Sequence, residues 1–225
     1  MLLSISDILE QDTLEWINKR IAKLAWHDGR KTAGASARAV KRNLQADLNS
    51  EIGRALDKKI LATLKSHPVL LAAARPKLFS NLLVSKTSEN DYYGPHIDNA
   101  LMKKGDQQFR SDLSFTLFLT PPAEYEGGEL VIHTAGVDQA VKGDAGDLML
   151  YPSTSIHEVA PITRGERIVC VGWIESLIAD PSRRETLFDL ENLRVSLRKA
   201  YAPNSPELLT LNKTIANLLR AWAQP

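Results

Sequence analysis

A histidine and an aspartate two residues apart, His96 and Asp98, offer two metal ligands near the middle of the chain. In an extended strand, residues two apart project to the same face, so this imidazole and this carboxylate can bind one metal ion from one side. The pair alone is weak evidence, because five histidines produce one such spacing by chance about one time in four. The interpretation therefore depends on further ligands.

A third ligand follows at His157, which begins another predicted strand after a turn over residues 151–155. Two histidines and one carboxylate from neighbouring strands form the facial triad that leaves positions on Fe(II) open for substrate and oxygen. Ten residues beyond His157, Arg167 begins a further apolar strand. A guanidinium there can hold the distal carboxylate of a dicarboxylic co-substrate through two hydrogen bonds. The four residues together predict an iron site with a co-substrate anchor.

The remaining histidines and one neighbouring arginine have simpler interpretations. His27 and His67 fall in the predicted helical part and are expected at the surface or at a helix end. His133 follows an apolar strand and is expected to be exposed, although it could line the mouth of a pocket. Arg164 lies in the turn before Arg167 and is the second-ranked anchor, with an ordinary turn charge as the favoured interpretation.

The composition narrows the class of protein. The 225 residues suit one domain with a small appendage, and the net charge of +1 argues against a dedicated nucleic-acid binder. Cys170 is the single cysteine, so neither an intramolecular disulfide nor a thiolate metal cluster is expected. The first residues lack the features of a signal peptide, and no apolar run reaches the roughly 18 residues of a membrane helix. We therefore expect a soluble, cytoplasmic protein without nucleic-acid or membrane partners, whose metal ligands are histidines and carboxylates.

Helices are predicted at both ends of the chain and strands between them. Apolar residues recur at three- and four-residue spacing over residues 7–24 and 39–64, with a glycine-punctuated loop over residues 26–34. After Pro76 the pattern changes to short apolar strands with glycine- and proline-rich turns, over residues 78–84, 113–119, 129–132, 147–151 and 167–174. Because no helical crossovers separate them, these strands predict an antiparallel sandwich or barrel, and helices return after Pro181.

Several segments resemble the bacterial PKHD-type hydroxylases, which are Fe(II)/2-oxoglutarate dioxygenases related to prolyl and lysyl hydroxylases. The resemblance lies in Tyr93–Ala100, Asp112–Leu119, Tyr125–Val131, Gly146–His157 and Val159–Arg167, and it extends to residues 28–34, 41–45 and 187–190. It implies a mainly β (α+β) fold, a double-stranded β-helix or jelly-roll barrel with flanking helices. We expect helices that pack on the barrel in residues 1–75, the dioxygenase core in residues 76–180, and a helical tail in residues 181–225 that could also form a homodimer.

The same resemblance implies the reaction and its site. The family's iron ligands fall on His96, Asp98 and His157, and its 2-oxoglutarate-binding arginine falls on Arg167. The implied enzyme is a 2-oxoglutarate-dependent hydroxylase that uses O2, releases succinate and CO2, and relies on L-ascorbate to keep its iron reduced. Its substrate stays open between a peptidyl prolyl or lysyl side chain and a small molecule.

One departure from the family pattern keeps alternatives open. Family members commonly place Asn-Arg-Tyr on the strand before the first histidine, whereas residues 80–86 read Ser-Asn-Leu-Leu-Val-Ser-Lys and lack the tyrosine. One alternative is a non-catalytic β-barrel that binds metal or 2-oxoglutarate as a sensor. A second is a cupin-like dioxygenase or isomerase, which would not require Arg167 and more typically uses three histidines.

Overall fold

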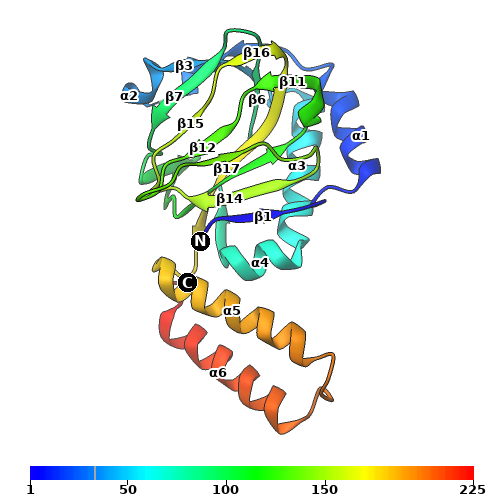
Figure 1. Cartoon of the computed structure of the whole chain (residues 1–225), viewed down its shortest axis with the longest axis vertical. Coiled ribbons are helices and arrows are strands. Elements are labelled where there is room, and N and C mark those ends of the chain that lie inside the picture. The colour runs from blue at the N-terminus through cyan, green and yellow to red at the C-terminus, as the bar shows by residue number, and fades with distance from the viewer. Residues whose placement is uncertain (33) are drawn as a thin grey trace.

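Two antiparallel sheets form the centre of the computed structural model, which describes residues 1–32 and 34–225 (Figure 1). The larger sheet has the strand order β1 (Leu3–Ile5), β14 (Leu148–Pro152), β10 (Leu113–Phe118), β17 (Arg167–Ser176), β6 (Leu83–Thr87), β4 (Leu44–Ala46) and β2 (Trp26–Asp28), and β5 (Pro76–Phe79) also pairs with β17. The smaller sheet has the order β13 (Gln139–Val141), β12 (Leu130–Ile132), β15 (His157–Val159), β7 (Tyr92–His96) and β3 (Lys41–Arg42).

The remaining strands form two small antiparallel sheets of two strands each. They are β8 (Leu101–Lys104) with β9 (Gln107–Arg110), and β11 (Tyr125–Gly127) with β16 (Ile162–Gly165). Short 3-10 turns lie at η1 (Gly29–Thr32) and η2 (Pro122–Glu124). The mainly β fold with flanking helices is as predicted, but hydrogen bonds join the described strands into separate sheets rather than into a closed barrel.

Apolar side chains of both sheets pack against each other at one end of the sandwich. They come from β12 on the smaller sheet and from β10, β14 and β17 on the larger one, and comprise Phe118, Leu130, Ile132, Met149, Tyr151 and Val169. Each is at most 5% exposed. Burial of this set, at roughly 25 cal/mol per Å² of apolar surface, holds the sheets face to face. The same two faces enclose the cavity described below.

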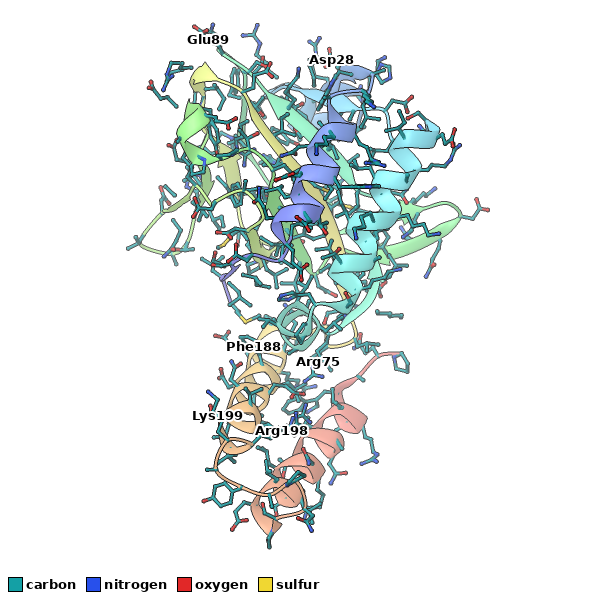
Figure 2. The ribbon with its side chains drawn as sticks, turned by 90° about the vertical axis from the view of Figure 1, so that its right-hand side faces the viewer. Asp28, Arg75, Glu89, Phe188, Arg198 and Lys199 are labelled. Atoms are coloured by element: carbon teal, nitrogen blue, oxygen red, sulfur yellow. The ribbon has the colours of Figure 1, made fainter. Side chains whose placement is uncertain are left out.

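Helices cover the outer face of the larger sheet, and the apolar spacing of their sequences explains why. Figure 2 shows α1 (Gln11–Ile21) and α3 (Glu51–Ser66) side by side across this sheet, with α4 (Pro68–Ala74) at its end. The buried residues of α1 are Leu14, Ile17 and Ile21, and those of α3 include Leu56, Ile60 and Leu64. They form one apolar stripe on each helix and join one core cluster with the sheet.

The helix expected over residues 39–64 is wrong in its first part. Lys41–Arg42 and Leu44–Ala46 are strands, and α3 begins only at Glu51, where the Ser50 hydroxyl accepts a hydrogen bond from the Gly53 N–H at 3.1 Å. Pairing of β4 with β6 outweighs the four-residue apolar spacing in this stretch, and Leu44 is 36% exposed. The spacing between Leu44 and Leu56 therefore does not trace one helical face.

Residues 1–75, expected as helices, also supply strands β1 to β4 to the two sheets. The loop expected over residues 26–34 contains strand β2 and the turn η1, while its Ala33 lies outside the described residues. The short α2 (Ala35–Arg38) follows it. The division of the chain at residues 75 and 180 remains a prediction.

The C-terminal residues form a helical hairpin of α5 (Pro181–Leu197) and α6 (Pro206–Trp222) that extends away from the sheets (Figure 1). A small core of its own contains Ile178, Leu187 and Ile215. None of the helices in the described residues is both long enough and apolar enough to cross a membrane.

A largely buried ion pair joins this hairpin to the core. The Arg75 guanidinium, just after α4, lies 2.5 Å from a carboxylate oxygen of Glu191 in α5, and Arg194 pairs with the same carboxylate. The side chain of Arg75 is 16% exposed and that of Glu191 is 10% exposed. Figure 2 shows Arg75 where the hairpin meets the core.

We predict that Glu191→Ala lowers the free energy of unfolding by about 3 kcal/mol, because it leaves the buried Arg75 without its counter-charge. Chemical denaturation, with hydrogen exchange of α5 amides, measures the change. Glu15→Ala removes an exposed pair with Lys19 and serves as the control, expected within about 0.5 kcal/mol of the unmodified protein. An equally small effect of both substitutions would contradict the assigned role of Glu191.

Candidate metal centre

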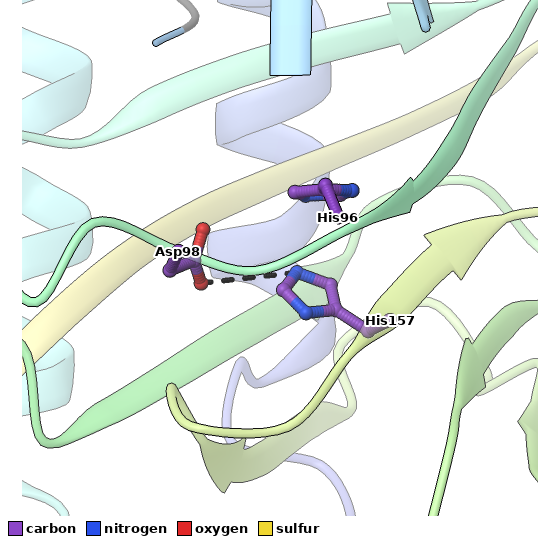
Figure 3. A group of neighbouring side chains, drawn as sticks. All are labelled: His96, Asp98 and His157. Atoms are coloured by element: carbon purple, nitrogen blue, oxygen red, sulfur yellow. Dashed lines mark ion pairs between the residues drawn. The ribbon is translucent and has the colours of Figure 1, made fainter. Parts of the chain in front are cut away.

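Pairing of β7 with β15 brings the two predicted histidine ligands together. His157 is the register partner of His96 on the smaller sheet, and the centroids of their rings lie 4.3 Å apart. Asp98 follows His96 in the loop after β7 and turns back toward the same point (Figure 3). Each of the three side chains offers one ligand atom, and these atoms all lie within 4.8 Å of one another. The cluster has the composition of a facial triad.

Backbone carbonyls orient both imidazoles. His96 Nδ1 lies 2.8 Å from the Gly94 carbonyl oxygen, and His157 Nδ1 lies 3.1 Å from that of Ser155. Because a carbonyl oxygen only accepts, both Nδ1 atoms must carry the proton and donate it. The Nε2 atoms are then unprotonated in the neutral rings, which is the form a metal ligand requires.

Two serines hold the carboxylate between them and the histidines. The Ser114 hydroxyl of β10 donates to Asp98 Oδ2 at 2.6 Å, and its oxygen lies 2.7 Å from the hydroxyl of Ser153. The same Oδ2 lies 3.7 Å from His157 Nε2 (Figure 3). Since β10 belongs to the larger sheet, this contact fixes Asp98 from the side opposite to the histidines.

The surroundings keep His96 neutral. Burial, and then the proximity of His157, lower the pKa of His96 to about 4, while the Gly94 carbonyl and Asp98 oppose the shift. The ring of Tyr93 stacks on His96 with centroids 3.6 Å apart and an interplanar angle of 15°. At neutral pH His96 is therefore uncharged and available to a cation.

The cluster opens into a cavity of about 270 Å³ between the two sheets. Its apolar lining includes Leu130, Val159, Val169 and Val171, and its polar lining includes Gln45, Ser85, Thr87 and Thr116. Among the described lining residues, the basic side chains are Lys41 and Arg167, and the one carboxylate is Asp98. The cavity therefore suits a small, anionic molecule.

Arg167, at the start of β17, reaches this cavity from the larger sheet and is 2% exposed. No carboxylate among the described residues lies within ion-pair distance of it, its Nε is buried without a hydrogen-bond partner in that part of the chain, and the Tyr125 hydroxyl is a polar neighbour. Burial lowers the pKa of this guanidinium. A buried cation without a counter-charge is costly, so the site fits a ligand that brings a carboxylate.

A glycine makes the close packing around Arg167 possible. Gly128 has φ +70°, and a Cβ atom there would lie 3.0 Å from Arg167 Cδ and 2.3 Å from Ile162 Cδ1. Glycine at position 128 thus leaves room for the arginine.

The other candidates lie outside the cavity lining. Arg164 is exposed and pairs with Glu126 at 2.9 Å, and His133 pairs with Asp138 at 2.9 Å. His27 is exposed on β2. His67 caps α4 by accepting a hydrogen bond from the Leu70 N–H at 3.4 Å. The simpler interpretations hold for Arg164, His27 and His67, whereas His133, expected to be exposed, is half-buried between Asp138 and Glu158.

Sequence reasoning missed Ser114, Tyr93 and Lys41, which contact or surround the triad. Ser114 had a detectable signal, because a small polar residue alternates with large apolar ones along β10. Lys41 had none, since its strand β3 was not predicted, and nothing in the sequence distinguished Tyr93 as the ring that stacks on His96. On β6, where the family tyrosine is missing, Leu83, Ser85 and Thr87 line the cavity.

Comparison with known families agrees with this geometry. Residues 82–175 match the 2OG-Fe(II) oxygenase superfamily, and residues 182–224 match the PKHD-type hydroxylase C-terminal domain. A PKHD-type hydroxylase of Hyphomonas neptunium is 51% identical over 222 residues, which is 99% of each chain. Another from Acidovorax ebreus is 42% identical over the full length of both chains.

Solved structures share the fold. A prolyl hydroxylase of Trichoplax adhaerens, in complex with a hypoxia inducible factor peptide fragment, has a TM-score of 0.58 at 13% identity and covers 83% of this chain and 86% of its own. A prolyl-4-hydroxylase of Pseudomonas putida has a TM-score of 0.50 at 22% identity, covering 78% and 92%. These likenesses, to oxygenases with a jelly-roll core, confirm the predicted fold class.

We predict that Ser114→Ala weakens metal binding by about 10- to 100-fold, because Asp98 loses the hydroxyl that orients it. Titration of the purified protein with Mn(II), followed by electron paramagnetic resonance, measures the affinity. The matched control is Ser176→Ala at the last residue of β17, outside the cavity lining. It removes another buried hydroxyl, which donates to the Ala74 carbonyl oxygen at 2.7 Å. If both variants bind Mn(II) like the unmodified protein, Ser114 does not support the carboxylate.

Proposed function

The chain belongs to the PKHD-type hydroxylases of the 2OG-Fe(II) oxygenase superfamily, and on this premise we propose that it hydroxylates its substrate in the cavity between the two sheets. It is a 2-oxoglutarate-dependent hydroxylase, and its family implies Fe(II) and 2-oxoglutarate. We assign His96, Asp98 and His157 as iron ligands and Arg167 as the anchor of 2-oxoglutarate. The observation that carries the assignment is a ligand cluster, with His157 buried and His96 and Asp98 half-buried, that shares one cavity with a buried guanidinium that has no ion pair among the described residues.

Two neutral imidazoles and one carboxylate give the metal site its character. His96 and His157 offer their Nε2 atoms, which the carbonyls of Gly94 and Ser155 leave unprotonated. Asp98 supplies the single negative charge, and Ser114 holds it in place. When bound, Fe(II) and 2-oxoglutarate supply the oxygen activation that hydroxylates the substrate and releases succinate and CO2.

In this proposal Arg167 binds 2-oxoglutarate and the cavity walls exclude water. The guanidinium offers a planar pair of donors for the distal carboxylate of 2-oxoglutarate, and it has no competing carboxylate among the described residues. The buried apolar side chains around it, Leu130 and Val169, exclude water and so strengthen that ion pair.

The substrate is a finer part of the proposal. Prolyl or lysyl side chains are suggested by the family, and the solved structures that share the fold of this chain include two prolyl hydroxylases. A small molecule is equally compatible. L-Ascorbate is proposed as the reductant on the family resemblance alone. A homodimer and a cytoplasmic location remain predictions from the sequence.

We predict that His96→Ala and Asp98→Ala each abolish Fe(II)-dependent conversion of 2-oxoglutarate to succinate, because each removes one of three metal ligands. Succinate release without added substrate, which reports uncoupled turnover, measures the effect. His133→Ala is the matched control, since it removes a histidine that also pairs with carboxylates but lies outside the cavity lining.

Two outcomes would change the assignment. Normal succinate release by either ligand variant would place the metal elsewhere. If the unmodified protein binds Fe(II) and 2-oxoglutarate under anaerobic conditions, seen by the charge-transfer absorption of the chelate, but releases no succinate in air, the non-catalytic sensor is the correct function.

Arg167→Ala is expected to raise the 2-oxoglutarate concentration needed for half-maximal succinate release by roughly 10- to 100-fold, because it removes a charge-assisted hydrogen-bonded pair. The maximal rate should change less, since the arginine does not ligate the metal. Arg164→Ala, at the exposed second-ranked anchor, provides the control. An unchanged requirement in Arg167→Ala would show that 2-oxoglutarate is anchored by another residue.

A further inference from the structure

The cavity contains a second buried cation that the proposed reaction does not use. Lys41 lies on β3, at the edge of the smaller sheet, and is only 6% exposed. It lines the cavity together with the metal ligands, Thr32 and Gln45. Lysine is rarely buried to this extent without a charged partner, so this position requires an explanation.

Lys41 forms no ion pair within the described residues. Its ammonium donates a long hydrogen bond to the Thr32 hydroxyl at 3.4 Å, and that hydroxyl itself donates to Gln45 Oε1 at 2.6 Å. No carboxylate there lies within ion-pair distance of its ammonium. Burial lowers the pKa of Lys41 to about 8, although Asp98 and Asp28 act in the opposite direction. A ligand that brings a negative charge would offset this cost.

The position of Lys41 places such a ligand next to the metal centre. Its Nζ lies 4.9 Å from the centroid of the Tyr93 ring, and the same ring stacks on His96 at 3.6 Å. Lys41 pairs with Tyr93 across β3 and β7 on the smaller sheet, whereas Arg167 reaches the cavity from the larger sheet. The two cations therefore approach the cavity from opposite walls.

When Fe(II) and 2-oxoglutarate are bound, the charge of Lys41 is the one that no other charge in the cavity balances. The two charges of Fe(II) and the one of Arg167 balance Asp98 and the two carboxylates of 2-oxoglutarate. Lys41 is then the remaining charge among the described residues that line the cavity. The component still to enter is the molecule to be hydroxylated.

We propose that Lys41 is a substrate-binding residue that holds a carboxylate of the molecule to be hydroxylated. This inference rests on the proposed function. It favours a free amino acid, another small carboxylic acid or a C-terminal residue over an internal prolyl or lysyl residue of a polypeptide, which has no carboxylate beside the reacting carbon.

A purely structural role is the competing explanation. The ammonium could serve only to hold the Tyr93 ring against His96 through a cation–π contact. Lys41→Met removes the charge and keeps the length of the side chain, whereas Lys41→Arg keeps the charge. A positioning role predicts that Lys41→Met binds the metal more weakly and keeps the ligand preference. A substrate-binding role predicts that Lys41→Met binds the metal as before and loses the ligand preference.

Lys86 offers a matched control on the outer face of the same sandwich. Its Nζ lies 4.9 Å from the Trp26 ring, the same distance as in the Lys41 contact, and it pairs with Glu166 at 3.5 Å. Its neighbours Ser85 and Thr87 line the cavity, but Lys86 does not. Lys86→Met therefore removes an equivalent cation–π contact without changing the charge of the cavity.

The test measures ligand binding to the full chain loaded with Mn(II) and saturating 2-oxoglutarate, so that Arg167 is occupied and no turnover follows. The probes are pairs that differ only in charge at one group: L-proline and L-prolinamide, L-lysine and L-lysinamide, benzoate and benzamide. Paramagnetic relaxation of probe protons reports binding near the metal, and competition titrations give the dissociation constants.

We expect at least one acid to bind about tenfold or more tightly than its amide, with this preference lost in Lys41→Met and retained in Lys41→Arg and Lys86→Met. An absence of any acid preference in the unmodified protein, or its survival in Lys41→Met, would overturn the inference. Weaker 2-oxoglutarate binding by Lys41→Met with an unchanged acid preference would assign Lys41 to the co-substrate instead. Failure of the unmodified protein to bind Mn(II) and 2-oxoglutarate would refute the proposed function itself.

Discussion

The pairing of β7 with β15 is the constraint on which the candidate site depends. It makes His157 the partner of His96 and places two imidazoles on the inner face of one sheet. A register slip of one residue would turn one imidazole to the opposite face. On its other edge β15 pairs with β12, where Ile132 opposite His157 is fully buried in the core between the sheets. The packing of the sandwich therefore fixes the geometry of the site.

The second consequence of the sandwich is electrostatic. Its two inner faces enclose one carboxylate, Asp98, between two buried cations, Lys41 and Arg167, that come from different sheets. Neither cation has an ion pair with a described residue. Because charges interact more strongly where water is excluded, the cavity is prepared for ligands that carry negative charge. Burial of two cations without ion pairs lowers the stability of the fold relative to apolar residues at the same positions, but it keeps both charges available to ligands.

The sequence was most informative where one residue type has few alternative uses. The order of His96, Asp98, His157 and Arg167, together with the family motifs around them, was enough to predict the cluster, and the apolar stripes of α1, α5 and α6 predicted helices. Short strands were harder to predict, because β3 and β4 have only two or three residues each and owe their conformation to partners distant in sequence. Lys41 was missed for the same reason, since its burial follows from pairing with Tyr93.

The decisive measurement is a structure of the protein crystallised anaerobically with Mn(II) and 2-oxoglutarate. We expect one metal ion bound by His96, Asp98 and His157, with the distal carboxylate of 2-oxoglutarate on Arg167. A metal ion bound by other residues would contradict it. So would 2-oxoglutarate with its distal carboxylate on Lys41 and no ligand at Arg167.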